Sequence, residues 1–339
     1  MSQEDPTAES RKHDHIALAF KSRVESGELD ARFYYEPALS AHPKEGSLKP
    51  FRFLGKTLRT PVWVSSMTGG TALARKINRN LAQACAEFGM GMGLGSCRQL
   101  LNSNEFLPDF DVRDIIGADL PLYANLGCAQ IEQLIENNSV EKLQELIDKL
   151  RADGLIIHVN PLQEAMQPEG DHFSRPPLEI VEEVVSRFNF PVIVKEVGQG
   201  FGPASLRALM KLPLGAIEFG AAGGTNFALL ELLRRNEQYQ NAFSGLARAG
   251  HTAAEMLEWT NSIATEPGNS CQTRHLIISG GVSDFLDGYW LTRQSALPAV
   301  YGQASAFLRH AQDDYDSLRT FVRAQVRGLE LANAFLMPR

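Results

Sequence analysis

Eight short apolar segments recur along the chain from Pro61 onward, and stretches with helical periodicity separate them. Some are apolar without a break, as at 192–194, which is typical of strands buried on both faces of a parallel sheet. The segments are residues 62–66, 90–94, 122–126, 155–159, 192–197, 216–219, 276–279 and 299–301. Between them, stretches such as 139–150 carry apolar residues along one helical face. Strand–helix alternation repeated eight times predicts an α/β fold, a (β/α)8 TIM barrel.

The 339 residues are long enough for two domains, but such barrels commonly use about 250 residues or more as one unit. We therefore expect a single domain, with residues 61–339 as the barrel and residues 1–60 as an N-terminal extension that forms part of the active-site cover. A last helix near 317–334 is expected to pack on the barrel. The segment 167–177, with three prolines, is expected to be a mobile flap.

Charge and composition exclude several classes of protein. Forty acidic residues against 33 basic ones give a net charge of −7, which argues against a nucleic-acid binder. The acidic start lacks the features of a secretory signal, and no run of about 18 apolar residues occurs, so we expect a cytoplasmic protein with no membrane segment. The four cysteines form no CxxC pair and are interpreted as buried free thiols rather than disulfides or zinc ligands.

Polar or glycine-rich motifs follow almost every expected strand at its carboxyl end. They are Met67-Thr68-Gly69-Gly70, Gly95-Ser96, Asn125 with Gln130, His158 to Glu164, Lys195-Glu196, Gly223-Gly224-Thr225-Asn226 and Gly280-Gly281. A single motif of this kind could simply end a strand or cap a helix. Their common register predicts instead that they converge on one mouth of the barrel, where active sites of this fold are built.

Individual residues at this mouth suggest particular chemistry. Gly280-Gly281 can present backbone N–H groups to a phosphate, so a phosphorylated cofactor would fit. Lys195 could neutralise an anionic ring or form a Schiff base, and the sequence leaves both open. His158 and Glu164 could be an acid and a base, or half of a metal site, while Asn160 and Gln163 are neutral groups suited to orienting a ligand.

A basic cluster precedes the barrel, at Arg11-Lys12-His13-Asp14-His15, with Lys21 and Arg23 close behind. In an acidic protein this cluster suits a diphosphate, although it could also be the solvated start of a helix. A zinc site at His13 and His15 is less favoured, because no third ligand follows at useful spacing.

Taken in order along the chain, these motifs resemble type 2 isopentenyl diphosphate isomerase. The resemblance runs from Arg11 to about Gly281, and His158-x-Asn160-Pro161-x-Gln163-Glu164 is its most specific motif. It implies a flavoprotein of isoprenoid biosynthesis that interconverts isopentenyl and dimethylallyl diphosphate. It also implies reduced FMN, maintained by NADPH, together with Mg²⁺, and a homo-oligomer, either a tetramer or an octamer.

The resemblance also implies roles for individual residues. The implied FMN-binding residues are Met67, Thr68, Gly69, Ser96, Asn125, Lys195, Thr225, Gly280, Gly281 and Ala304. The implied substrate-binding residues are Arg11, Lys12, His15, Asn160 and Gln163. His158 and Gln163 would be catalytic, Glu164 would bind Mg²⁺ at the diphosphate, and Lys195 would lie beside the N1–C2=O edge of the anionic reduced flavin.

The chain departs from the family pattern at two places. Ser244-Gly245-Leu246-Ala247-Arg248 stands where Trp-Gly-Ile-Pro-Thr is common, and Ser283 replaces an arginine two residues after the seventh-strand glycine pair. Two other functions are therefore considered. One is an FMN-dependent 2-hydroxy-acid oxidase, which would have a His-Gly-x-Arg type signature where this chain has Ser279-Gly280-Gly281-Val282. The other is a non-catalytic barrel that binds flavin or a prenyl diphosphate.

Overall fold

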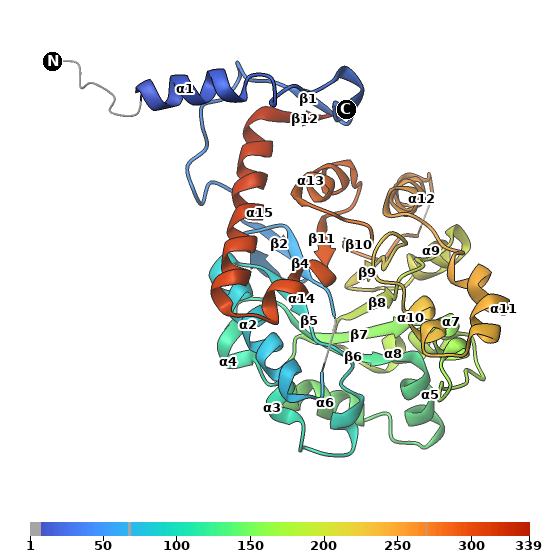
Figure 1. Cartoon of the computed structure of the whole chain (residues 1–339). Coiled ribbons are helices and arrows are strands. Elements are labelled where there is room, and N and C mark those ends of the chain that lie inside the picture. The colour runs from blue at the N-terminus through green and yellow to red at the C-terminus, as the bar shows by residue number, and fades with distance from the viewer. Residues whose placement is uncertain (1–7, 67–68, 269) are drawn as a thin grey trace.

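A computed structural model describes residues 8–66, 69–268 and 270–339 of the chain (Figure 1). Eight parallel strands form a closed barrel in which each strand pairs with the next in sequence and the last pairs with the first. They are β4 (Val62–Val64), β5 (Gly91–Gly93), β6 (Leu122–Gly127), β7 (Gly154–Val159), β8 (Val192–Glu196), β9 (Ala216–Glu218), β10 (Leu276–Ser279) and β11 (Ala299–Gln303). The predicted TIM barrel is thus confirmed, and the predicted strand ends differ from the observed ones by only one or two residues.

Helices surround the barrel and pack their apolar faces on its strands (Figure 1). The longer ones are α2 (Ala72–Phe88), α5 (Cys128–Glu136), α6 (Lys142–Leu150), α8 (Pro177–Arg187), α11 (Glu237–Ala247), α12 (Ala253–Thr265), α13 (Phe285–Gln294) and α15 (Tyr315–Phe335). The shorter ones are α3 (Leu107–Phe110), α4 (Arg113–Ile116), α7 (Pro161–Met166), α9 (Pro203–Leu209), α10 (Phe227–Leu233) and α14 (Ser305–Ala311). No helix in the described part of the chain is long and apolar enough to span a membrane.

A two-stranded hairpin closes the end of the barrel opposite its mouth. Strands β2 (Phe51–Phe53) and β3 (Lys56–Leu58) pair antiparallel. The fully buried Phe53 ring lies 6.4 Å from the Trp63 ring and 4.7 Å from that of His275. Because these partners stand at the amino-terminal ends of β4 and β10, the hairpin leaves the carboxyl ends of the strands open for a site.

The first part of the extension lies apart from the barrel mouth. Helix α1 (Ala8–Leu18) precedes β1 (Phe33–Tyr35), and β1 pairs with β12 (Leu336–Pro338) after the last helix. In Figure 1, α1, β1 and β12 gather at the far end of α15 from α14. The extension is therefore held to the C-terminus, a contact that the sequence does not indicate because each strand has only three residues.

Candidate active site

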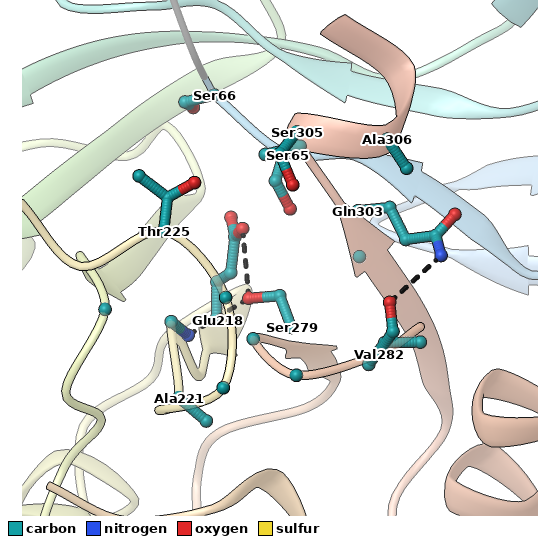
Figure 2. Close-up of a pocket in the computed structure, with 18 of the residues that line it drawn as sticks. Ser65, Ser66, Glu218, Ala221, Thr225, Ser279, Val282, Gln303, Ser305 and Ala306 are labelled. Carbon is teal, nitrogen blue, oxygen red and sulfur yellow. Dashed lines mark hydrogen bonds between the residues drawn. The ribbon is translucent and has the colours of Figure 1, made fainter. Parts of the chain in front are cut away.

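Two adjoining cavities open at the carboxyl ends of the barrel strands. The larger has a volume of about 370 Å³ and the smaller about 120 Å³. Both are lined by Ser66, Lys195, Val197 and Phe227, so they are parts of one mouth. Figure 2 shows the larger cavity, with side chains from β9, β10 and β11 and from the loop after β4 around it.

One wall of the larger cavity is bare backbone. Gly280 and Gly281 have φ of 91° and 70°, in the left-handed region that favours glycine. A Cβ on Gly280 would lie 2.0 Å from the Ala221 oxygen, and one on Gly223 would lie 2.9 Å from the Gly281 Cα. The loops after β9 and β10 therefore approach too closely for side chains, and their peptide groups face the cavity. Such a surface suits a phosphate or another anion.

Two charged side chains are buried at the mouth on neighbouring strands. Lys195 on β8 and Glu218 on β9 are paired in register, and they are 7% and 0% exposed. The Lys195 Nζ donates a hydrogen bond of 2.7 Å to the Glu196 carbonyl oxygen. One Glu218 oxygen accepts a hydrogen bond of 3.3 Å from Ser279 Oγ. Glu218 was not predicted as a site residue, although an acidic residue inside an otherwise apolar strand is a recognisable signal of a functional site.

His158 is held in one orientation at the smaller cavity. Asn125 Nδ2 donates to the Leu94 oxygen (3.0 Å), so its Oδ1 faces His158 Nδ1 at 2.9 Å. Burial, and to a smaller degree the charge of Lys195, lowers the pKa of His158 to about 3. The imidazole is therefore neutral near pH 7, donates from Nδ1 and keeps an acceptor lone pair on Nε2.

The low pKa of His158 predicts a specific dependence of stability on pH. The unfolded chain takes up this proton near pH 6.5 and the folded chain only near pH 3, so the wild type loses stability as the pH falls through that window. His158→Gln is expected to remove on the order of 3 kcal/mol of the stability difference between pH 7 and pH 4. Urea unfolding of both proteins at the two pH values measures it, and an unchanged difference would contradict a buried neutral histidine.

A hydrogen-bonded network fixes Glu164 at the start of α7. Asn160 Nδ2 donates to Gln163 Oε1 (3.1 Å) and Glu164 Oε1 (2.9 Å), and the Asp171 backbone N–H donates to Glu164 Oε2 (2.8 Å). The Asp171 carboxylate in turn accepts from Gln130 Nε2 at 2.8 Å. Glu164 is thus one oriented carboxylate. Within the described ranges, no three or more His, Cys, Asp or Glu side chains form a group that could hold a metal ion.

The loop at 167–177, which the sequence predicts to be a mobile flap, is joined to α5 and α7 by hydrogen bonds in the structure. Besides the contacts of Asp171, the buried carboxylate of Glu132 on α5 accepts hydrogen bonds from the backbone of Ser174 (3.2 Å) and Arg175 (2.9 Å). Both acidic side chains were missed in the sequence, because their partners come from elements distant in the chain.

The structure brings most of the predicted site residues together. Those at the mouth are Ser96, Asn125, His158, Gln163, Lys195, Thr225, Gly280, Gly281 and Ala304. Asn160 and Glu164 are hydrogen-bonded beside Gln163, and Gly69 lies against the Phe110 ring. Met67 and Thr68 lie outside the described residues. Arg11, Lys12 and His15 are exposed on α1 and do not line the mouth.

The first departure from the family pattern falls at the end of helix α11 and just after it. A small apolar cluster, separate from the barrel core, joins this helix to α7 and α10. Its buried members are Met166, Ala228, Leu232 and Ala247, with Leu162, Tyr239 and Phe243 packed against them. The altered segment therefore supports the helix that carries Gln163 and Glu164.

Two proteins of known name are similar to this chain over most of its length. A protein of Rickettsia prowazekii named isopentenyl-diphosphate delta-isomerase is 34% identical over 305 residues, covering 89% of this chain and 85% of the relative. A Rickettsia felis protein of the same name is 32% identical over 325 residues, covering 95% and 90%. No protein-family model matches the chain.

Solved structures share the fold at low sequence identity. A mandelate oxidase variant with an FMN adduct has a TM-score of 0.55 and 13% identity, over 91% of this chain and 88% of that one. A flavocytochrome b2 variant with pyruvate bound also has a TM-score of 0.55 and 13% identity, over 94% and 78%. At this identity the likeness establishes the barrel fold alone.

Proposed function

Since the chain belongs to the isopentenyl-diphosphate delta-isomerase family, we propose that it interconverts isopentenyl and dimethylallyl diphosphate, using reduced FMN and Mg²⁺. The observation that carries this proposal is the mouth itself, where a glycine-walled anion surface and a buried lysine line one pair of cavities. An oriented glutamate, Glu164, is tied through Asn160 to Gln163 at the edge of the smaller cavity. We further propose that NADPH supplies the electrons for FMN, and that the enzyme is a cytoplasmic homo-oligomer, a tetramer or an octamer.

The residues of the larger cavity fit FMN. The peptide groups of Gly280 and Gly281 suit the phosphate, with Ala304 on the same wall and Ser283 in place of a side-chain cation. Three buried polar atoms at the mouth, Ser65 Oγ, Ser66 Oγ and Glu218 Oε2, have no hydrogen-bond partner among the residues that the structure describes, as expected where a polar ligand completes them. Met67, Thr68, Gly69, Ser96, Asn125 and Thr225 are assigned to the ring and its chain.

The chemistry of Glu164 fits Mg²⁺ that is shared with a diphosphate. Mg²⁺ usually takes one or two carboxylates from a protein and completes its octahedron with phosphate oxygens and water. Glu164 supplies one carboxylate, and Asn160 and the Asp171 backbone orient it. We therefore assign Glu164 as the metal ligand and Asn160 as a residue that positions both the metal ligand and the substrate.

A double-bond shift adds one proton and removes another with no net redox change. When bound, reduced FMN supplies the N5 atom, which can donate and accept these protons. The chain positions the reacting carbons: neutral His158 offers an acceptor at Nε2, and Gln163, tied to Asn160, contacts the same end of the substrate. The phenyl ring of Phe227, which lines both cavities, excludes water from the alkene.

The basic residues of α1 are proposed to bind the diphosphate, which requires this segment to close over the mouth from its place apart from it. Lys12→Ala and Arg11→Ala are each expected to raise KM about 10-fold or more with a smaller effect on kcat, because they would hold a group that does not react. Steady-state kinetics at saturating Mg²⁺ measures both constants, with Lys49→Ala, an exposed lysine of the same extension outside the basic cluster, as the control. An unchanged KM in both variants would remove the cluster from the substrate site.

Flavin binding tests the cofactor assignment and one alternative function. We expect one FMN per chain in an absorbance titration, and no binding would exclude a flavoenzyme. The mandelate oxidase and flavocytochrome b2 neighbours make a 2-hydroxy-acid oxidase the second candidate. Flavin reduction by mandelate or lactate in the FMN-loaded protein would favour that function, whereas none is expected, because Ser279-Gly280-Gly281-Val282 lacks its histidine.

A further inference from the structure

The carboxylate of Glu218 lines the larger cavity, and its hydrogen bonds to the described residues are incomplete. Figure 2 shows it between Ser65, Thr225 and Ser279, with its only drawn hydrogen bond to Ser279. That hydroxyl also accepts from the Gly220 N–H at 3.0 Å, so it is fixed in place. Glu218 is fully buried, and among the described residues its second oxygen, Oε2, has no hydrogen-bond partner of good geometry. A carboxylate in this setting is costly as an anion unless a cation or a proton compensates it.

Lys195 is the cation that faces Glu218. The two residues are directly paired across β8 and β9, but no ion pair joins them in the described structure, and the Lys195 Nζ bonds to the Glu196 carbonyl instead. Burial raises the pKa of the Glu218 carboxyl, and the charge of Lys195 opposes that rise. The ionisation of Glu218 therefore depends on whether the positive charge of Lys195 is available to it or is engaged by another anion.

The other ionisable groups near Lys195 and Glu218 are less suited to bind the proton. His158, on the far side of Lys195, has its pKa lowered to about 3 and stays neutral. Burial also raises the pKa of the Glu196 carboxyl. Unlike Glu218, however, Glu196 accepts three backbone hydrogen bonds that oppose this rise, from the N–H groups of Gly198, Gln199 and Gly200 at 2.6–2.7 Å. Arg309 and His310 also line the cavity, but they lie on helix α14 and not on the two strands that carry Lys195 and Glu218.

We propose, building on the FMN site proposed above, that Glu218 binds a proton when the flavin in this mouth is reduced and releases it on oxidation. With the neutral oxidised ring, Lys195⁺ and Glu218⁻ balance. Reduction to the anionic flavin consumes two electrons and one proton at N5 and places a second negative charge beside the same ammonium. Because like charges in a low-dielectric site disfavour each other's ionised forms, Glu218 then takes up one proton from solvent, and the site is again neutral.

The proposal predicts the number of protons taken up by the FMN-loaded protein. Wild type is expected to take up two protons for every two electrons near neutral pH, one on the flavin and one on Glu218. Glu218→Gln has the same size and no titratable proton, so it should take up one. The matched control is Glu169→Gln, the same chemical change at a surface glutamate that lines neither cavity, and it should still take up two protons. Potentiometric titration over a range of pH gives the count, because the pH slope of the midpoint potential is proportional to it.

An infrared difference spectrum between reduced and oxidised protein gives a second readout. A protonated-carboxyl band should appear on reduction of wild type and be absent in Glu218→Gln. Equal proton counts in the two proteins, or a wild-type count of one without the band, would overturn the proposal, and the wild-type measurements decide even if the variant does not fold. Failure of wild type to bind FMN would instead overturn the cofactor assignment, and this inference with it.

Discussion

Replacing Glu164 with glutamine is expected to raise the Mg²⁺ concentration needed for half-maximal rate by at least about 10-fold, the cost commonly seen even for residues that only support a metal ligand. The substitution preserves size and keeps an oxygen for Asn160, but it removes the charge that attracts the metal. The variant should fold and bind FMN as wild type does, because Glu164 lies outside the cavity walls.

The measurement for Glu164 is rate against Mg²⁺ concentration at two pH values. Glu169→Gln is the matched control, since Glu169 lies just after α7, the helix that carries Glu164, and pairs with Arg234 at the surface. If Glu164 were a general base, added Mg²⁺ would not rescue the variant and the pH profile would lose its acidic limb. Wild-type behaviour in both experiments would remove Glu164 from the site.

Replacing Lys195 with alanine is expected to weaken binding of reduced FMN about 10- to 100-fold more than binding of oxidised FMN. A hydrogen bond to a charged group contributes about 1.5–3 kcal/mol, and only the reduced ring carries the negative charge that the ammonium would meet. Lys195→Met, which keeps the apolar stem, separates this effect from lost packing.

Fluorescence or absorbance titrations under anaerobic conditions give both dissociation constants for each variant. An equal loss for the two flavin forms would indicate that Lys195 only supports the structure of the mouth. Selective loss in Lys195→Ala that is absent in Lys195→Met would assign the effect to packing rather than charge.

The barrel could be predicted from the sequence because its signal is local and repeated. Segments such as 155–157 and 192–194 are apolar without interruption, and the polar residues after them share one register, so the strands and most of the mouth could be predicted. The β1–β12 and β2–β3 pairs could not be predicted in this way. Each involves strands of three residues, and the first joins opposite ends of the chain.

The site residues that were not predicted also depend on contacts between segments far apart in the sequence. Asp171 and Glu132 act on Glu164 and its loop through hydrogen bonds between elements that are far apart in sequence. Glu218 lies in a strand of three residues. Its role at the site depends on its burial and on its pairing with Lys195, and both are seen only in the folded barrel.

The proposed reaction is a double-bond shift without net redox change, so the amount of product formed should be compared with the amount of NADPH consumed. Purified protein with FMN, Mg²⁺ and isopentenyl diphosphate, reduced once by NADPH under anaerobic conditions, is expected to form many molecules of dimethylallyl diphosphate for each NADPH oxidised. No dimethylallyl diphosphate, or NADPH oxidation in step with product, would contradict it.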